Sequence, residues 1–189
     1  MSDPSHRARI PTSIHPYSAG LVGGLIGGMA MAAFAVAWGL ITQGSLWYSV
    51  NLLAGTMLTG FAEMTQDELA TFSSAGLIVG IIIQACMSIG VGLLYGVMLP
   101  MIPRFQWLFA LIIVPLMWSG LTWSAISVVD PALGKHINWL WFVASQLVFG
   151  LVTGWWILRT EKINTMQNWH YLERLGIDSP GIRNMGDDA

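Results

Sequence analysis

Long segments without charged residues are the feature of this sequence that most constrains its fold. No Asp, Glu, Lys or Arg occurs in four segments, residues 10–62, 69–103, 105–129 and 136–158. A hydrocarbon layer about 30 Å thick is crossed by about 20 mostly apolar helical residues, and each segment supplies that length. With 54% hydrophobic and only 10% charged residues, the chain has too little polar surface for a water-soluble domain. The sequence therefore predicts an all-α, polytopic membrane protein.

Prolines and charged residues set the predicted limits of the helices. We expect four spans at about residues 18–42, 73–99, 105–127 and 137–158, which form a membrane domain over residues 18–158. Residues 1–17 and 159–189 are then an N-terminal and a C-terminal tail. Beyond Leu158, apolar residues recur at every third position as far as Gly176. This pattern predicts that the fourth helix continues as a helical C-terminal extension.

Residues 46–61 form an apolar segment that could be a fifth crossing or an interfacial or re-entrant element. The basic residues decide between the two, because Lys and Arg are retained on the cytoplasmic side of a membrane. Five spans divide them three against five, whereas four spans place Lys135 alone on one side and seven on the other: Arg7, Arg9, Arg104, Arg159, Lys162, Arg174 and Arg183. We therefore expect four spans, with both termini cytoplasmic and residues 46–61 at the outer face.

Small residues at helical spacing predict close contacts between helices. Where lipid surrounds the helices, small side chains let two backbones approach and so drive helix association. The rows with this spacing are Gly20, Gly24 and Gly28; Gly76 and Gly80; Gly92 and Gly96; and Gly150 and Gly154. Four helices have few inner faces, so we expect some rows to pack inside the chain and others to meet further membrane subunits.

Polar residues within the predicted spans are few, and none of them is ionisable. We expect four of them to hydrogen-bond between helices: Gln84, Ser88, Ser145 and Gln146. A contact to a quinone or another substrate is the alternative role for the two glutamines. Proton pumps and many transporters keep an ionisable residue within their spans, so this composition argues against proton-coupled transport.

The histidines and the cysteine do not form a cofactor site by themselves. A membrane haem with two imidazole ligands needs two histidines at one depth, but His15 and His136 fall at opposite ends of the predicted bundle. Cys86 is the only cysteine, so no disulfide within the chain can form. We therefore expect no enzyme activity, no metal and no cofactor of the chain's own. A haem shared with a neighbouring subunit, with His15 or His136 as one ligand, stays open.

The outer loop carries three carboxylates, Glu63, Asp67 and Glu68, and no basic residue between positions 43 and 72. Thr65 and Glu68 have the spacing of a capping box, which predicts the start of a helix. The carboxylates are then either a cap and a solvated helix start, or a docking patch for a basic partner such as a c-type cytochrome.

Aromatic and basic residues meet at the predicted cytoplasmic boundary. The default role of Trp155 and Trp156 is to anchor the helix at the interface. The alternative is a site for an anionic phospholipid headgroup, because basic pockets between helices bind such headgroups. Its candidate residues are Arg104, Trp155, Trp156, Arg159 and Lys162.

Four stretches of the sequence carry a resemblance to a known group: HPYSAGLVGGLIGGMAMA, GSLWYSVNLLAG, LLYGVMLPMIPR and VDPALGKHINWLWFVASQLVFGLVTG. They resemble uncharacterised four-span bacterial membrane proteins that are encoded beside alternative complex III and haem-copper oxidases. The resemblance covers about residues 15–160 and implies association with a respiratory electron-transfer assembly. We therefore expect a non-catalytic accessory subunit. The alternatives are a small homo-oligomeric transporter or channel lined by Gln84, Ser119 and Gln146, and an assembly factor for an oxidase.

Overall fold

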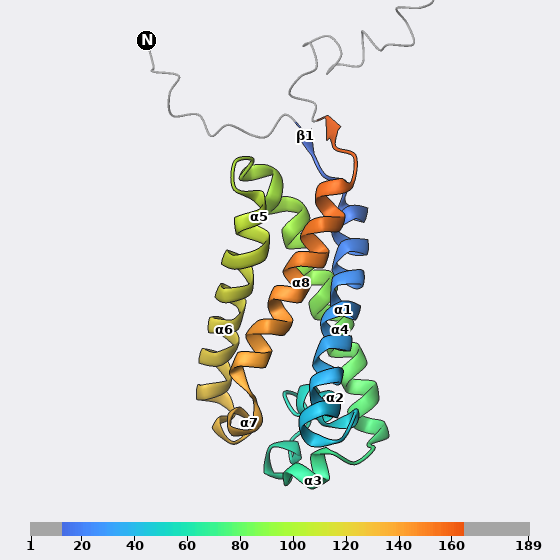
Figure 1. Cartoon of the computed structure of the whole chain (residues 1–189), viewed down its shortest axis with the longest axis vertical. Helices are drawn as coiled ribbons and strands as arrows, with labels where there is room; N and C mark the ends of the chain where they lie inside the picture. Colours follow the sequence, from blue (N-terminus) through green and yellow to red (C-terminus); the bar gives the residue numbers. More distant parts are fainter. Residues whose placement is uncertain (1–12, 165–189) are drawn as a thin grey trace, which may run out of the picture.

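The computed structural model of the chain describes residues 13–164 and is almost entirely helical, which confirms the all-α prediction (Figure 1). Four helical stretches are long and apolar enough to cross a membrane: Tyr17–Gln43, Ser74–Met101, Gln106–Val129 and Trp139–Arg159. Their ends lie within two residues of the predicted limits, because proline, glycine and charge changes mark these ends in the sequence.

The four long helices are α1 (Tyr17–Gln43), α4 (Ser74–Met98), α6 (Val114–Val129) and α8 (Trp139–Arg159). The short helices are α2 (Trp47–Ala54), η2 (Phe61–Glu63), α3 (Gln66–Leu69), η3 (Leu99–Met101), α5 (Gln106–Leu108), η4 (Phe109–Ile113) and α7 (Pro131–His136). Helix α1 packs against both α4 and α8, and α6 packs against α8 (Figure 1). The long helices therefore contact one another in the order α4, α1, α8 and α6, with α1 and α8 as the two inner helices.

Two short strands join the two ends of the described chain. Strand β1 (Ser13–Ile14) pairs antiparallel with β2 (Ile163–Asn164) at one end of the bundle (Figure 1). Helix α8 ends at Arg159, and Thr160 has an extended backbone. The expected continuation of the helix beyond Leu158 is therefore wrong for residues 160–164, which are not helical and pair with β1 at Ile163 and Asn164. Residues 165–189, with the rest of the predicted extension, and residues 1–12 lie outside the described residues.

Pro115 lies beside an irregular turn of the third long helical stretch. In η4 the backbone N–H of Val114 donates to the carbonyl of Phe109, five residues earlier. In the same register residue 115 would donate to Ala110, but proline has no N–H. The Tyr95 hydroxyl of α4 donates to the Ala110 carbonyl instead, at 2.7 Å, and both residues are buried. A side chain of another helix thus replaces the backbone donor that Pro115 removes.

Replacing Tyr95 by Phe tests this interpretation. The variant keeps the ring but leaves the buried Ala110 carbonyl without the hydroxyl donor, so we expect a loss of about 1–3 kcal/mol in the free energy of unfolding. Thermal unfolding of the purified protein in detergent measures this loss. Tyr17→Phe is the control, because Tyr17 is exposed at the start of α1. Equal stability of the two variants would contradict the role given to Tyr95.

The loops opposite the strands form a second packed unit. Helix α2 has eight residues and a length of about 12 Å, which is too short to cross a membrane. Its Tyr48 packs with three further buried residues, Trp38, Phe61 and Leu69. The Tyr48 hydroxyl donates to the carbonyl of His136 at 3.0 Å, which joins α2 to the end of α7. The segment at residues 46–61 thus folds back onto the bundle.

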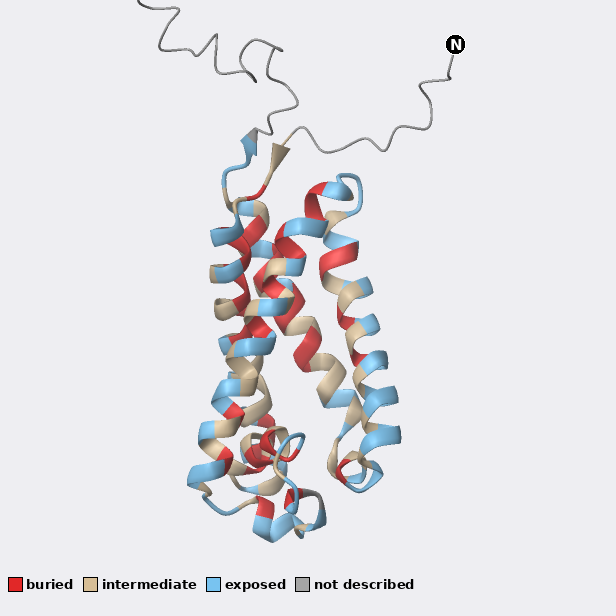
Figure 2. Cartoon of the chain, turned by 180° about the vertical axis from the view of Figure 1, so that it is seen from behind, coloured by how far each residue is buried: buried red, intermediate tan, exposed pale blue. Residues whose placement is uncertain are grey.

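The outer faces of the bundle are apolar and exposed. Figure 2 shows buried residues where helices face one another and exposed residues along the opposite faces. Large exposed side chains on α4 and α6 include Ile78, Ile82, Leu94, Leu116, Met117, Leu121 and Trp123. Such a surface is unusual for a soluble monomer, in which contiguous exposed apolar patches are small.

Candidate functional site

Every glycine of the predicted rows lies against another segment of the same chain. Added Cβ atoms at Gly20, Gly24 and Gly28 would meet Gly92 or Ser88 of α4, and one at Gly96 would meet Gly20. The remaining contacts run from Gly76 to Asn51, from Gly80 to Val50, from Gly92 to Gly20 and Gly24, and from Gly150 and Gly154 to Ala110. These nine glycines therefore leave no row for a neighbouring subunit, contrary to the expectation that some rows would meet one.

Two further glycines of α1 face α8 instead of α4. A Cβ atom added to Gly27 would overlap the Thr153 hydroxyl, and one added to Gly23 would lie 3.1 Å from Ile157. Thr153 is fully buried and its hydroxyl donates to the Gly23 carbonyl at 3.2 Å. Thr153 was not among the residues predicted from the sequence, although its position beside Gly154 in a row of small residues was the available signal.

The four predicted interhelical polar residues have different environments. Gln84 donates through its amide nitrogen to the Gly28 carbonyl of α1 at 2.9 Å, so it does bond between helices. Ser88 accepts from Gln84 of its own helix at 3.3 Å and packs against α1. Ser145 donates to Phe142 of its own helix at 2.7 Å, so its bond is not interhelical. Gln146 is buried but makes no side-chain hydrogen bond to another described residue.

The predicted lipid-headgroup residues divide into separate contacts. The guanidinium carbon of Arg159 lies 4.3 Å from the centre of the Trp155 ring, in cation–π geometry. Trp156 points instead toward Gly23 of α1. Arg104 lies 5.5 Å from the ring centre of Phe105, its neighbour in the chain. The pair Arg159 and Trp155 is therefore the part of this set that the fold brings together on one exposed surface.

His15 lies between β1 and α1 and is only 4% exposed. Neither ring nitrogen has a hydrogen-bond partner among residues 13–164. Burial lowers the pKa of His15, and the nearby charge of Lys162 lowers it further, while the Thr160 backbone acts in the opposite direction. The folded protein therefore favours a neutral imidazole at this position, which is the form that binds metals.

His136 lies at the opposite end of the bundle from His15, at the end of α7 (Figure 1). The two are separated by about the length of α8, roughly 30 Å. Among residues 13–164, no group of three or more His, Cys, Asp or Glu residues is placed to hold a metal ion.

The three acidic residues of the outer loop are all exposed. Glu68 accepts hydrogen bonds from the backbone N–H of Thr65 at 2.8 Å and from its hydroxyl at 2.9 Å, and the predicted capping box is confirmed. These two bonds, the backbone bond first, hold the pKa of Glu68 below its ordinary value. Glu68 therefore caps α3, while Asp67 and Glu63 are the carboxylates left for a partner.

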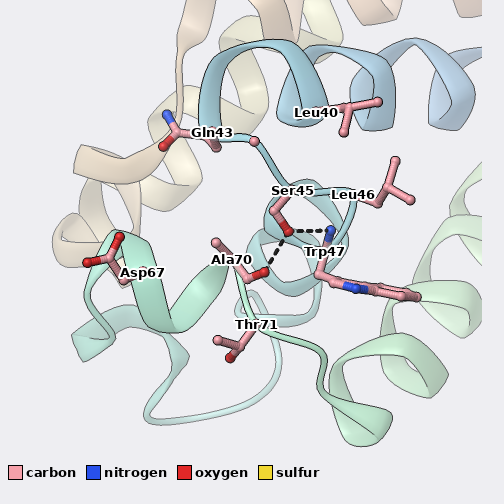
Figure 3. Close-up of a pocket in the computed structure, with 9 residues that line it drawn as sticks. Leu40, Gln43, Ser45, Leu46, Trp47, Asp67, Ala70 and Thr71 are labelled. Carbon is pink, nitrogen blue, oxygen red and sulfur yellow. Dashed lines mark hydrogen bonds between the residues drawn. The ribbon is translucent and has the colours of Figure 1, made fainter.

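Asp67 borders an open cleft of about 520 Å³ between the end of α1 and α3 (Figure 3). The Ser45 hydroxyl spans one wall, because it accepts from the Trp47 backbone N–H at 3.0 Å and donates to the Ala70 carbonyl at 2.5 Å. Gln43 and Trp47 also line the cleft. It is therefore a recess with both polar and apolar walls, lined by Leu40 and Leu46 as well, and with one carboxylate at its rim within the acidic outer loop.

These features are contacts between helices and surfaces of the bundle. The part of the chain that the structure describes contains no arrangement of catalytic groups. Glycine contacts close the interfaces of α1 with α4 and α8, and the sides of the bundle are apolar. The end that carries β1 has more basic than acidic residues in the described chain, and the opposite end has more acidic than basic residues. A comparison of the chain with protein-family models, with curated proteins and with solved structures found no match.

Proposed function

We propose that this protein is a non-catalytic accessory subunit of a multi-subunit respiratory complex in a bacterial inner membrane. One observation carries the proposal: the interior is filled by backbone contacts, while α4 and α6 direct large apolar side chains outward. A bundle of this kind offers lipid and neighbouring helices a packing surface. The association with an electron-transfer assembly rests on the resemblance described above.

The polar residues assigned to a channel do not favour a path through one copy of the chain. Gln84 is bonded to the Gly28 carbonyl, and the Ser119 hydroxyl donates to the Pro115 carbonyl of its own helix at 2.7 Å. The cavity beside Gln146 has a volume of only about 30 Å³. A transporter or channel would therefore need a path between several copies.

The two ends of the bundle suit different partners in this proposal. Arg159 and Trp155 would hold an anionic phospholipid headgroup at the cytoplasmic face. Asp67 and Glu63 would attract a basic partner such as a c-type cytochrome at the outer face, because opposite charges steer association. Neither role requires a cofactor bound by this chain.

Purification of the tagged protein in mild detergent tests the proposed function. We expect stoichiometric co-migration with haem-bearing membrane subunits in native mass spectrometry and a haem band in the visible spectrum of the complex. A colourless homo-oligomer would favour the transporter, and substoichiometric, transient association would favour the assembly factor. Loss of a haem band in His15→Ala or His136→Ala, with the subunit still present, would identify a redox subunit instead.

The proposed orientation makes a separate prediction. Arg104, Arg159 and Lys162 lie at the end of the bundle that carries β1, whereas Lys135 lies in α7 at the opposite end. This distribution supports a cytoplasmic location for the β1 end. In a Cys86→Ala background, Thr65→Cys should react with an impermeant thiol reagent added to intact spheroplasts. Glu161→Cys should react only after the membrane is permeabilised, and the reverse pattern would contradict the orientation.

A further inference from the structure

A small cavity lies where the four long helices meet. Its volume is about 30 Å³, and each helix contributes to its wall: Met31 from α1, Ser88 from α4, Trp118 from α6, and Gln146 and Phe149 from α8. Most of the wall is apolar. Ser88 and Gln146 are therefore the residues that decide what the cavity can hold.

Both of these polar side chains have hydrogen-bonding capacity that residues 13–164 do not use. The Gln146 side chain lines the cavity and is 8% exposed, yet it makes no hydrogen bond to another described residue. The Ser88 hydroxyl accepts from Gln84 at 3.3 Å but donates to no described residue. Because buried amides and hydroxyls are almost always hydrogen-bonded, this arrangement indicates a missing partner.

The volume of the cavity selects the partner. A water molecule occupies about 30 Å³ in the liquid and needs a cavity of at least about 10–15 Å³, whereas cavities that bind an aromatic ring measure about 150 Å³. The recess beside Gln146 therefore fits a water molecule.

We propose that the cavity binds one ordered water that accepts from the Ser88 hydroxyl and donates to the side-chain carbonyl oxygen of Gln146. The water completes a chain that begins at the Gly28 carbonyl and runs through Gln84 and Ser88. The water links α8 to α1 and α4. Among the described residues, no side-chain hydrogen bond joins α4 directly to α8. This binding site does not depend on the proposed respiratory role.

Radiolytic labelling of the full-length protein in lipid nanodiscs tests the proposal, because millisecond X-ray pulses produce hydroxyl radicals from bound water. Oxidation of Met31 and Phe149 is measured by mass spectrometry. We expect both to be labelled in the wild type and labelled at least threefold less in Gln146→Leu. Ser145→Ala is the matched control, because Ser145 is the adjacent residue and its hydroxyl bonds within its own helix.

Ser88→Ala is the second variant, since it removes the other proposed partner of the water without enlarging a side chain. It should reduce the labelling of Phe149 in the same way. If Gln146→Leu does not fold, Ser88→Ala still tests the proposal. Absence of labelling at Met31 and Phe149 in the wild type would show that the cavity is dry. Unchanged labelling in the folded variants would equally overturn the proposal.

Discussion

Replacing Gly92 by Ala should lower the stability of the protein by about 3 kcal/mol or more. A Cβ atom at this position would overlap the Gly20 carbonyl oxygen and the Gly24 Cα atom of α1. Overpacking usually costs about 1–3 kcal/mol, and here the obstacle is a backbone that cannot rotate away. In a chain of this size the midpoint of thermal unfolding should fall by roughly 6–12 °C. Differential scanning fluorimetry in detergent measures the change.

Gly90→Ala is the matched control, because Gly90 lies two residues away on the same helix with no atom within 4 Å of an added Cβ. Alanine forms helices better than glycine by up to about 1 kcal/mol, so this variant should be as stable as the wild type or more stable. Equal losses in the two variants would show that α1 and α4 do not meet at Gly92.

Replacing Asn51 by Leu should release the outer loop from the bundle. The Asn51 side-chain nitrogen donates to the Leu69 carbonyl at 2.9 Å and to the Thr71 carbonyl at 2.8 Å, and the residue is almost completely buried. Leucine has a similar size but no donor, so two carbonyls lose their partner. At about 1–3 kcal/mol for each unsatisfied group, we expect the two carbonyls together to cost about 2–6 kcal/mol in the free energy of unfolding.

Limited proteolysis of the purified protein, together with its thermal unfolding, measures this effect. Cleavage between residues 56 and 72 should become faster in Asn51→Leu, because the loop then opens more often. Gln66→Leu is the control, since Gln66 is exposed on α3 in the same loop. A cleavage rate equal to that of the control would show that Asn51 does not hold the loop.

The sequence by itself determined the features that depend on neighbouring residues in the chain. Charge-free segments and their flanking prolines predicted the four long helices to within two residues. The capping box of Thr65 and Glu68 was also predictable, because both of its partners lie within one turn of helix. These signals are local, so they do not require knowledge of which helices are neighbours.

Only the tertiary structure decided how these elements meet. The glycine rows of α1 were visible in the sequence, but spacing alone does not say that Gly24 faces α4 and Gly27 faces α8. The same holds for Tyr95, whose hydroxyl reaches the carbonyl that Pro115 leaves unpaired, and for Asn51, which binds carbonyls about twenty residues away. Residues 160–164 read as helix from their apolar spacing, yet they pair with β1 in part. In each case the partner is distant in the chain, and packing of the whole bundle brings it into contact.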